Sequence, residues 1–280
     1  MSASVTVAYA GRDGAHGAAA CDRLFPGNAD VTALPTFTAV AEATIAGDVE
    51  FGVLPIESSL SGAVAETHDL LYASPLSIVG ETVLRIRHHL LAPQQVPLEQ
   101  IRVVHSHPAA LDQCRRLIAA MPWATAVAAT TTAEAAAQVA ASGDPAEAAI
   151  AGERARDLYG LTVLAADVGD HAEAYTRFVS IATHTRVDGD RAAWRTAFSF
   201  VTDHRPGALH RAIEPFARQG IDLVQLVSRP IPETPWRYRF HAVLAGHPLD
   251  APTMEALAEA RKLTRRLKVF GSYPAESADH

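Results

Sequence analysis

Short apolar runs alternate with longer Ala-rich segments over residues 1–185 of the chain. Runs rich in Val, Ile and Leu are typical of strands buried in a sheet, and the Ala-rich segments between them are typical of helices. The predicted strands are 5–10, 29–34, 51–56, 101–106, 125–130, 147–152, 161–168 and 176–185, with a long extended segment at 76–92. The predicted helices are 14–25, 38–47, 108–120, 132–142 and 152–159. This alternation of strands and helices indicates an α/β fold.

The order of elements changes after a polar, Gly-containing segment at 186–193, which we interpret as a linker. Strand-like runs then occur at 194–203, 221–230, 236–246 and 267–274, with helix-like segments at 207–219 and 252–266. Their order is β-α-β-β-α-β, the ferredoxin-like arrangement, in roughly 80 residues. The sequence therefore predicts a small separate α+β domain after the α/β region.

Composition narrows the possible partners and locations. A chain of 280 residues with a formal charge of −7 has no broad electrostatic attraction for nucleic acid or an anionic membrane, so a local cluster must hold any bound anion. The N-terminus has neither a basic stretch nor a cleavage site, and no apolar run approaches the ~20 residues of a membrane-spanning helix, which predicts a cytoplasmic protein. Two cysteines form no disulfide framework, and we expect Cys21 and Cys114 to be small buried apolar residues.

The stretch GVLPIESSLSGAV (52–64) combines an apolar run with several hydroxyl groups. We expect a buried strand that turns at Pro55 into a polar loop. Hydroxyls and free N–H groups at the C-terminal end of a parallel strand are where open α/β sheets bind ligands. A Ser-rich turn that merely caps the next helix is an equally good interpretation of this stretch. The predicted loop contains Glu57, Ser58, Ser59 and Ser61 and is closed by Gly62.

Two further turns follow predicted strands. GRDGAHG (11–17) lacks the G-x-G-x-x-G spacing of a dinucleotide site, so we interpret it as a tight strand-to-helix turn whose amides face a cleft. At the second turn, Ser106 or His107 is placed to cap the helix that starts at Pro108, and the N-terminus of that helix is suited to an anion. No metal-binding framework of His and Cys is present among the 13 histidines, so we predict no metal site.

YTRFVSI (175–181) places a hydroxyl and a guanidinium side by side at the start of a strand-like run. A fixed cation beside a proton donor suits a small anionic substrate. Thr-Arg is also an ordinary pair at the edge of a strand, so Thr176 and Arg177 alone leave both interpretations open.

Taken together, nine stretches resemble prephenate dehydratase with an appended ACT regulatory domain, and the resemblance covers nearly the whole chain. In the α/β region these are GVLPIESSLSGAV, SHPAALDQC (106–114), TTAEAAAQV (131–139), AAIAGERARDLYGLTVLA (148–165) and YTRFVSI, which carries the family's Thr-Arg-Phe sequence. In the last domain they are GALHRAIEPFARQGIDL (207–223), SRP (228–230), WRYRF (236–240) and GSYP (271–274).

The resemblance implies a two-lobed catalytic domain similar to type II periplasmic binding proteins, followed by a ferredoxin-like ACT domain. The implied boundaries are 1–185 for the catalytic domain, with lobe 1 at about 1–78 plus 166–185 and lobe 2 at about 79–165, then 186–193 for the linker, 194–275 for the ACT domain and 276–280 for a tail. The implied activity is the decarboxylating dehydration of prephenate to phenylpyruvate in phenylalanine biosynthesis, with no cofactor.

Site residues follow from the same resemblance. It assigns Thr176 the catalytic role of donating a hydrogen bond to the departing oxygen. The implied substrate-binding residues are Glu57, Ser58, Ser59, Ser61, Gly62, Ala15, His16, His88, Ser106, His107, Arg177 and Phe178. The implied effector site for phenylalanine or a related amino acid is formed by Gly207, Ala208, Leu209, Val227, Ser228, Arg229 and Pro230. A homodimer or homotetramer, assembled through ACT and catalytic domains, is also implied.

The chain departs from the family pattern at three positions. Ser58 and Ala174 stand where the family has Asn, and Val227 stands where the effector sequence E-S-R-P has Glu. The first two keep open one alternative, a related enzyme that decarboxylates prephenate without aromatisation. A non-catalytic amino-acid sensor is a second alternative, from another class of protein. The third departure predicts altered regulation by phenylalanine.

Overall fold

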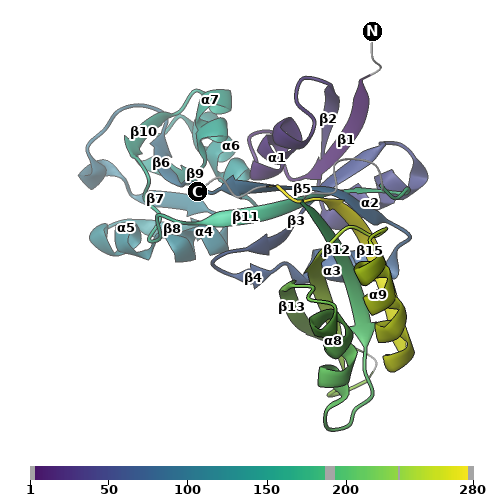
Figure 1. Ribbon diagram of the computed structural model, residues 1–280. Helices are drawn as coiled ribbons and strands as arrows, with labels where there is room; N and C mark the ends of the chain where they lie inside the picture. The colour runs from purple at the N-terminus through teal and green to yellow at the C-terminus, as the bar shows by residue number, and fades with distance from the viewer. Residues whose placement is uncertain (1–3, 187–192, 233, 277–280) are drawn as a thin grey trace. The chain divides into compact units, whose positions relative to one another are not determined.

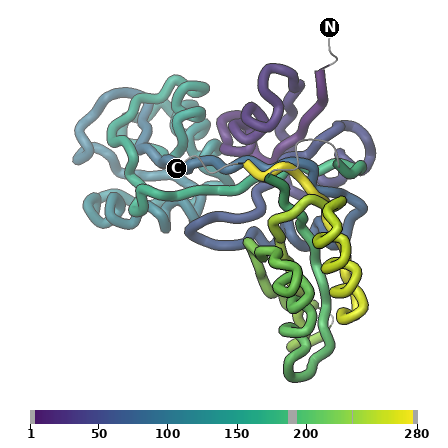
Figure 2. Tube along the Cα trace, viewed as in Figure 1, coloured from purple at the N-terminus to yellow at the C-terminus, as the bar shows by residue number. Residues whose placement is uncertain are grey.

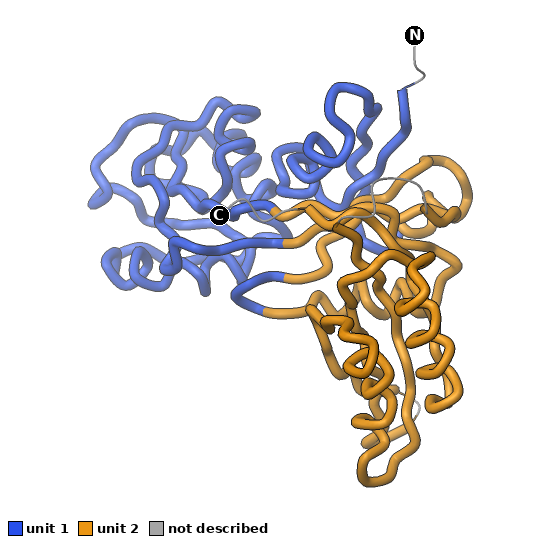
Figure 3. Tube along the Cα trace, viewed as in Figure 1, with its two compact units in different colours: residues 1–40, 58–61, 84–176 blue, residues 41–57, 62–83, 177–280 orange. Residues whose placement is uncertain are grey.

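The computed structural model describes residues 4–186, 193–232 and 234–276 (Figure 1). Contacts divide the chain into two compact units: unit 1 contains residues 1–40, 58–61 and 84–176, and unit 2 contains 41–57, 62–83 and 177–280 (Figure 3). The strands are β1 Val5–Ala10, β2 Ala29–Leu34, β3 Phe51–Ser58, β4 Gly62–Ala63, β5 Ser77–Arg85, β6 His89–Ala92, β7 Val103–Ser106, β8 Thr125–Ala128, β9 Glu147–Ala151, β10 Thr162–Ala165, β11 Tyr175–Ala182, β12 Trp194–Val201, β13 Leu223–Pro230, β14 Tyr238–Ala245 and β15 Arg266–Pro274. The helices are α1 His16–Leu24, α2 Phe37–Ala46, α3 Ala65–Ala73, α4 Pro108–Gln113, α5 Arg115–Ala120, α6 Thr132–Ser142, α7 Glu153–Tyr159, α8 Ala208–Arg218 and α9 Ala251–Leu263.

Unit 1 contains a five-stranded mixed sheet in the order β10-β6-β9-β7-β8 and the parallel pair β1-β2. Neighbouring residues of one strand enter different cores because side chains alternate between the faces of a sheet. Leu90 packs with the residues of α4 and α5, whereas Leu91 packs with those of α6 and α7. Helices on both faces confirm the α/β prediction for this part of the chain. Cys21 and Cys114 are buried free thiols as predicted, and burial raises the pKa of each to about 12.

Unit 2 contains strands β3, β11 and β5 in that order, together with the C-terminal domain. The C-terminal domain has the predicted β-α-β-β-α-β order and a four-stranded antiparallel sheet arranged β13-β14-β12-β15. Figure 2 shows the trace of this domain, coloured from green to yellow. Helices α8 and α9 cover one face of this sheet, where Phe198, Phe200 and Phe216 form the centre of a buried apolar cluster. The ferredoxin-like prediction is therefore confirmed.

The opposite face of the C-terminal sheet packs against α3 and β5 within unit 2. Lys268 donates from Nζ to the carbonyl oxygens of Leu71, Tyr72 and Ser74 at 2.8, 3.0 and 2.5 Å, which satisfies the C-terminal end of α3. A side chain at Gly271 would collide with the backbone of Ile78, so β15 approaches β5 too closely for any other residue. Contacts with α3 and β5 thus cover β15 on this face, while Val224 and Leu226 of the edge strand β13 remain exposed.

Several predicted boundaries were wrong. Strand β3 continues through Pro55 to Ser58, because Val64 donates to the carbonyl of Ile56 and β4 pairs with β3, so the loop begins only at Ser59. The predicted helix 108–120 is broken at Cys114 into α4 and α5. Helix α9 ends at Leu263, three residues before the prediction, since β15 begins at Arg266. Most of the predicted linker lies outside the described residues.

A buried histidine pair joins α3 to the C-terminal sheet. The rings of His68 and His241 lie 4.7 Å apart between centroids. Burial lowers the pKa of His68 to about 4, assisted by the cation of Arg229, while Asp69 and Glu57 act in the opposite direction. Burial lowers the pKa of His241 to about 3, assisted by His68 and by the cations of Arg239 and Arg229. Both rings are therefore neutral at neutral pH.

The lowered pKa values of His68 and His241 predict that the protein loses stability in mild acid. Unfolded histidine has a pKa of about 6.5, so below this value the unfolded chain binds more protons than the folded chain and the free energy of unfolding falls. The loss is at most about 1.4 kcal/mol per pH unit for each ring. Denaturant unfolding between about pH 7 and pH 5 measures it. The His241→Phe variant should show a smaller loss, whereas His204→Gln, at an exposed position, should behave like the unmodified protein.

Candidate active site

Strand β11 carries the Thr-Arg-Phe sequence and separates its side chains onto two faces. Thr176 and Phe178 share one face, and Arg177 points to the other because side chains alternate along a strand. Thr176 is partly exposed at the start of β11, whereas Phe178 is only 4% exposed and belongs to the core. The hydroxyl and the guanidinium therefore do not act as a pair on one side of the strand.

The segment that leads into Thr176 is held on both sides of its backbone. Ser59 donates from its backbone N–H to the carbonyl of Tyr175 at 2.8 Å and accepts the N–H of Tyr175 on its hydroxyl at 2.9 Å. Ile86 donates to the carbonyl of Ala174 at 2.7 Å. These contacts fix the residue immediately before Thr176, so Ser59 acts here as a clamp on the backbone.

The serine turn at 58–61 is organised by its own hydroxyl. Ser58 accepts the N–H groups of Leu60 and Ser61 on Oγ at 3.3 and 3.4 Å. Gly62 follows with a φ of 77°, a conformation that suits glycine. The hydroxyl of Ser58 thus stabilises the turn, and the exposed residues Ser59 and Ser61 remain accessible from it.

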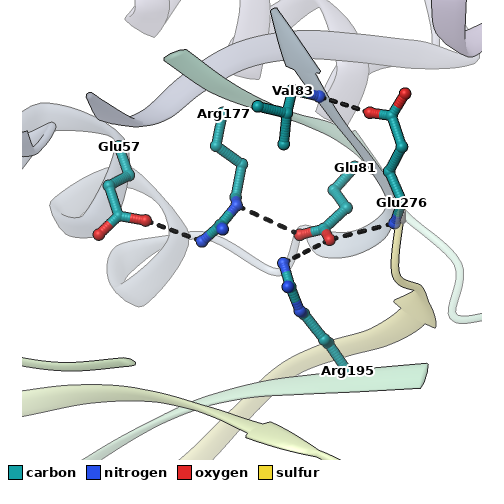
Figure 4. Close-up of polar contacts among 6 residues, drawn as sticks. All are labelled: Glu57, Glu81, Val83, Arg177, Arg195 and Glu276. Carbon is teal, nitrogen blue, oxygen red and sulfur yellow. Dashed lines mark hydrogen bonds and ion pairs between the residues drawn. The ribbon is translucent and has the colours of Figure 1, made fainter. Parts of the chain in front are cut away.

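Arg177 lies in a network of charged residues within unit 2 (Figure 4). It donates from Nη1 to Glu57 Oε2 at 2.7 Å, and its Nε lies 3.7 Å from Glu81 Oε2. Arg195 donates to Glu81 Oε1 at 2.6 Å. Burial raises the pKa of the Glu81 carboxyl, although both guanidinium groups act in the opposite direction. Glu57 and Arg177, two of the predicted substrate ligands, bind each other in this structure.

A cavity of about 420 Å³ lies within unit 1 beside the turn that follows β1. Its lining includes Ala15 and His16, both predicted substrate ligands, and three guanidinium groups. Thr176 belongs to the same unit but does not line this cavity. The cavity is lined by Gly14, Ala15, His16, Ala19, Arg85, Arg87, Gly152, Glu153, Arg154 and Asp157.

The guanidinium groups of this cavity differ in how they are held. Arg85 donates from Nε and Nη2 to the carbonyl oxygen of Ala172 at 3.2 and 2.9 Å and lies 3.6 Å from Glu173. Arg87 lies 3.8 Å from Asp167, which is longer than a hydrogen bond. Arg154 is paired with Asp22. Arginine forks bind carboxylates in two-point contacts, so the cavity is suited to an anion with carboxylate groups.

Two neutral histidines border the same region. Burial lowers the pKa of His16 to about 4, assisted by His88, whose ring centroid is 6.2 Å away. Burial also lowers the pKa of His88, which shares a hydrogen bond with Gln113 at 3.0 Å. Neutral imidazoles contribute hydrogen bonds to a ligand, not charge.

Ser106 and His107 lie at the end of β7. Ser106 is buried and donates to the carbonyl of Ile150 at 2.6 Å, so it joins β7 to β9 and does not cap a helix. His107 caps α4 by accepting the N–H of Ala109 on Nδ1. Of the two residues predicted to cap this helix, His107 is therefore the one that does so.

Sequence reasoning missed five charged residues that the structure places around these sites. Arg85, Arg87 and Arg154 line the cavity, and Glu81 and Arg195 complete the network around Arg177. A carboxylate inside the apolar run SIVGETVLR was the available signal, because a buried charge requires a partner. Within residues 4–186, 193–232 and 234–276, no group of His, Cys, Asp and Glu is arranged to hold a metal ion.

The sequence model of the family described as prephenate dehydratase matches residues 7–186. The chain belongs to the prephenate dehydratase family. It is 34% identical over 282 residues to arogenate dehydratase/prephenate dehydratase 2 of Arabidopsis thaliana, covering 98% of this chain and 74% of the relative.

Solved structures of similar chains agree in fold over nearly the whole length. A prephenate dehydratase from Arthrobacter aurescens, solved in complex with L-Phe, is 30% identical with a TM-score of 0.87, covering 99% of this chain and 94% of that chain. GqqA, described as a novel type of quorum quenching acylase, is also 30% identical with a TM-score of 0.87, covering 98% and 100%. The prediction of family and of fold class is confirmed.

The predicted effector residues of the C-terminal domain lie at two places. Gly207, with a φ of 75°, precedes α8, whose first residues are Ala208 and Leu209. The segment 227–230 lies at the end of the edge strand β13, where Arg229 donates to Asp69 of α3 at 2.9 Å. Arg229 thus ties the predicted effector segment to α3.

Among the described residues, none of the helices has the length and apolar character of a membrane-spanning segment.

Proposed function

We propose that the chain is a prephenate dehydratase that converts prephenate to phenylpyruvate for phenylalanine biosynthesis. The observation that carries this proposal is the family match over residues 7–186, which include the Thr-Arg-Phe sequence at 176–178. The relative from Arabidopsis thaliana, named for arogenate and prephenate dehydration, aligns with 98% of the chain.

The proposed reaction breaks two bonds of the substrate. The bond to the ring carboxylate breaks as CO2 leaves, its electron pair completes the aromatic ring, and the bond between C4 and oxygen breaks. The departing oxygen takes up a proton and leaves as water. Because aromatisation supplies the driving force, the protein needs only to orient the dianion and to deliver the proton.

Thr176 is the proposed donor to the departing oxygen, supported by its partial exposure and by the fixed backbone before it. A threonine hydroxyl is a weak acid, so the proton that completes the water molecule comes through a relay. Arg85 and Arg87, in the same compact unit as Thr176, are proposed to bind the carboxylates of the substrate. The serine turn and the buried neutral His16 are proposed as hydrogen-bonding groups.

The product spectrum of purified protein with prephenate tests this function. Phenylpyruvate supports the proposal, a non-aromatic keto acid supports a decarboxylase, and unchanged prephenate supports a non-catalytic sensor. The similarity to GqqA adds a further candidate, so an acylated amine is assayed in parallel. Release of its free acid with prephenate untouched would replace the dehydratase proposal by acyl-amide hydrolysis.

Ser58→Asn is expected to preserve or raise kcat/KM for prephenate. An Asn carboxamide oxygen can accept the turn amides of Leu60 and Ser61 as Ser58 Oγ does, and its NH2 adds donors toward a ligand. Steady-state kinetics measure the effect, with Ser58→Ala as the matched control that loses the turn contacts. A large loss in Ser58→Asn would mean that the pocket is built around serine and would favour another substrate.

The C-terminal domain is proposed to be an ACT domain that binds phenylalanine or a related amino acid. The β-α-β-β-α-β fold and the similarity to a structure in complex with L-Phe support this assignment. The proposed assembly is a homodimer or homotetramer through ACT and catalytic domains, and a cytoplasmic location stays a prediction.

A further inference from the structure

A chain of alternating charges connects the C-terminal domain to strand β11 (Figure 4). Arg195 on β12 donates to Glu81 Oε1 at 2.6 Å. The other oxygen of Glu81 lies 3.7 Å from Nε of Arg177, on β11. Arg177 in turn donates to Glu57 at 2.7 Å. Two carboxylates therefore alternate with two guanidinium groups.

Glu81 is the buried centre of this chain of charges. Its side chain is 0% exposed, whereas those of Arg177 and Arg195 are 24% and 21% exposed. A carboxylate removed from water persists only where cations and hydrogen-bond donors surround it. Loss of either cation therefore disturbs Glu81 and, through it, the other cation.

The end of β15 reaches the same carboxylate. The backbone N–H of Glu276 donates to Glu81 Oε1 at 3.3 Å, and the side chain of Glu276 accepts the N–H of Val83 at 2.5 Å. The C-terminal domain thus holds Glu81 from two strands, through Arg195 on β12 and through the backbone after β15. Displacement of either contact, the guanidinium of Arg195 or the backbone N–H of Glu276, should therefore change the position of Glu81 and hence of Arg177.

We propose that Glu81 is a positioning residue that ties the C-terminal domain to the strand carrying Thr176. Arg177 directly follows Thr176 on β11. The ion pair between Glu81 and Arg177 therefore fixes the position of the backbone that carries the Thr176 hydroxyl. The kinetic part of this inference rests on the proposed dehydratase function. Displacement of a catalytic group by a fraction of an ångström lowers kcat more than it raises KM, because the substrate still binds.

Hydrogen exchange tests the connection without any assumption about the reaction. In Glu81→Gln and in Arg195→Met, peptides covering Tyr175–Ala182 should exchange several-fold faster than in the unmodified protein. Lys268→Met is the matched control, since Lys268 also joins the C-terminal sheet to α3 but has no contact with β11 among its hydrogen bonds. Its β11 peptides should exchange at the normal rate.

Steady-state kinetics with prephenate are the second test of the positioning role. Glu81→Gln and Arg195→Met should lower kcat about tenfold with little change in KM, and Arg195→Lys should recover most of the loss. Lys268→Met should keep its kcat while melting at a lower temperature.

The outcomes separate this inference from the proposed function. Unchanged exchange of β11 in folded Glu81→Gln or Arg195→Met overturns the positioning role, as does an equal loss of kcat in Lys268→Met. If Glu81→Gln fails to fold, the hydrogen exchange of β11 in Arg195→Met decides whether the positioning role holds. If the unmodified protein leaves prephenate intact, the dehydratase proposal fails and the exchange arm alone judges the connection.

Discussion

The Thr176→Val variant is expected to fold normally and to lose about 100-fold or more in kcat with prephenate. Valine keeps the β-branched shape that suits a strand and removes only the hydroxyl. Thr176 is only partly buried, at the start of β11, so removal of its hydroxyl should cost the fold little. The effect on turnover should therefore appear without an effect on stability, as measured by thermal melting beside steady-state kinetics.

Thr176→Ser is the matched control for this prediction. Serine keeps the donor, so its kcat should stay within about tenfold of the unmodified protein. Near-normal turnover in Thr176→Val would remove the hydroxyl from the mechanism. An equal loss in Thr176→Ser would instead show that the β-branched shape of the side chain is required as well as its hydroxyl.

The fold was predictable wherever the local pattern was unambiguous. Strands β1 and β2 and helix α6 have the predicted boundaries, because apolar runs or a Thr cap and a following Gly mark their ends. Helix α3 was expected only in the interpretation in which the Ser-rich turn caps the next helix, and without bounds, since its nine residues show little separation of apolar and polar faces. Its packing against the C-terminal sheet stabilises it, and that contact is long-range.

The candidate site was predictable only in part, because some of its contacts join residues that lie far apart in the sequence. The serine turn and the Thr176 segment follow from local sequence, and the structure joins them through Ser59 and Tyr175, 116 residues apart. The partners of Arg177 did not follow from the sequence, because Glu57 lies 120 residues away in the chain and Glu81 lies on another strand. Strand alternation already separated Arg177 from Thr176, but it does not identify what Arg177 binds.

Regulation by phenylalanine is expected to be weak in the unmodified protein and to strengthen in Val227→Glu. An ammonium group needs acceptors, and Val227 offers none where the family has a carboxylate. If that carboxylate contacts the effector, its absence costs about 1.5–3 kcal/mol, which is about a tenfold to hundredfold loss of affinity. The inhibition constant for phenylalanine in Val227→Glu should fall by that factor.

The surroundings of Val227 are able to accept the new carboxylate. Val227 lies opposite His241 in the pairing of β13 with β14, and Arg229 lies two residues further on the same face. A glutamate there would face cations and a neutral imidazole, so burial should not force it to be neutral. The same carboxylate should raise the low pKa of His241, which NMR titration of the ring can follow.

Two controls decide whether charge at position 227 is the cause. Val227→Gln adds length and hydrogen-bonding groups without charge, and Val224→Glu adds a carboxylate at an exposed position of the same strand. Neither should sharpen the response to phenylalanine. Inhibition of the unmodified protein by micromolar phenylalanine would contradict the prediction, because carbonyl oxygens alone would then suffice to bind the ammonium group.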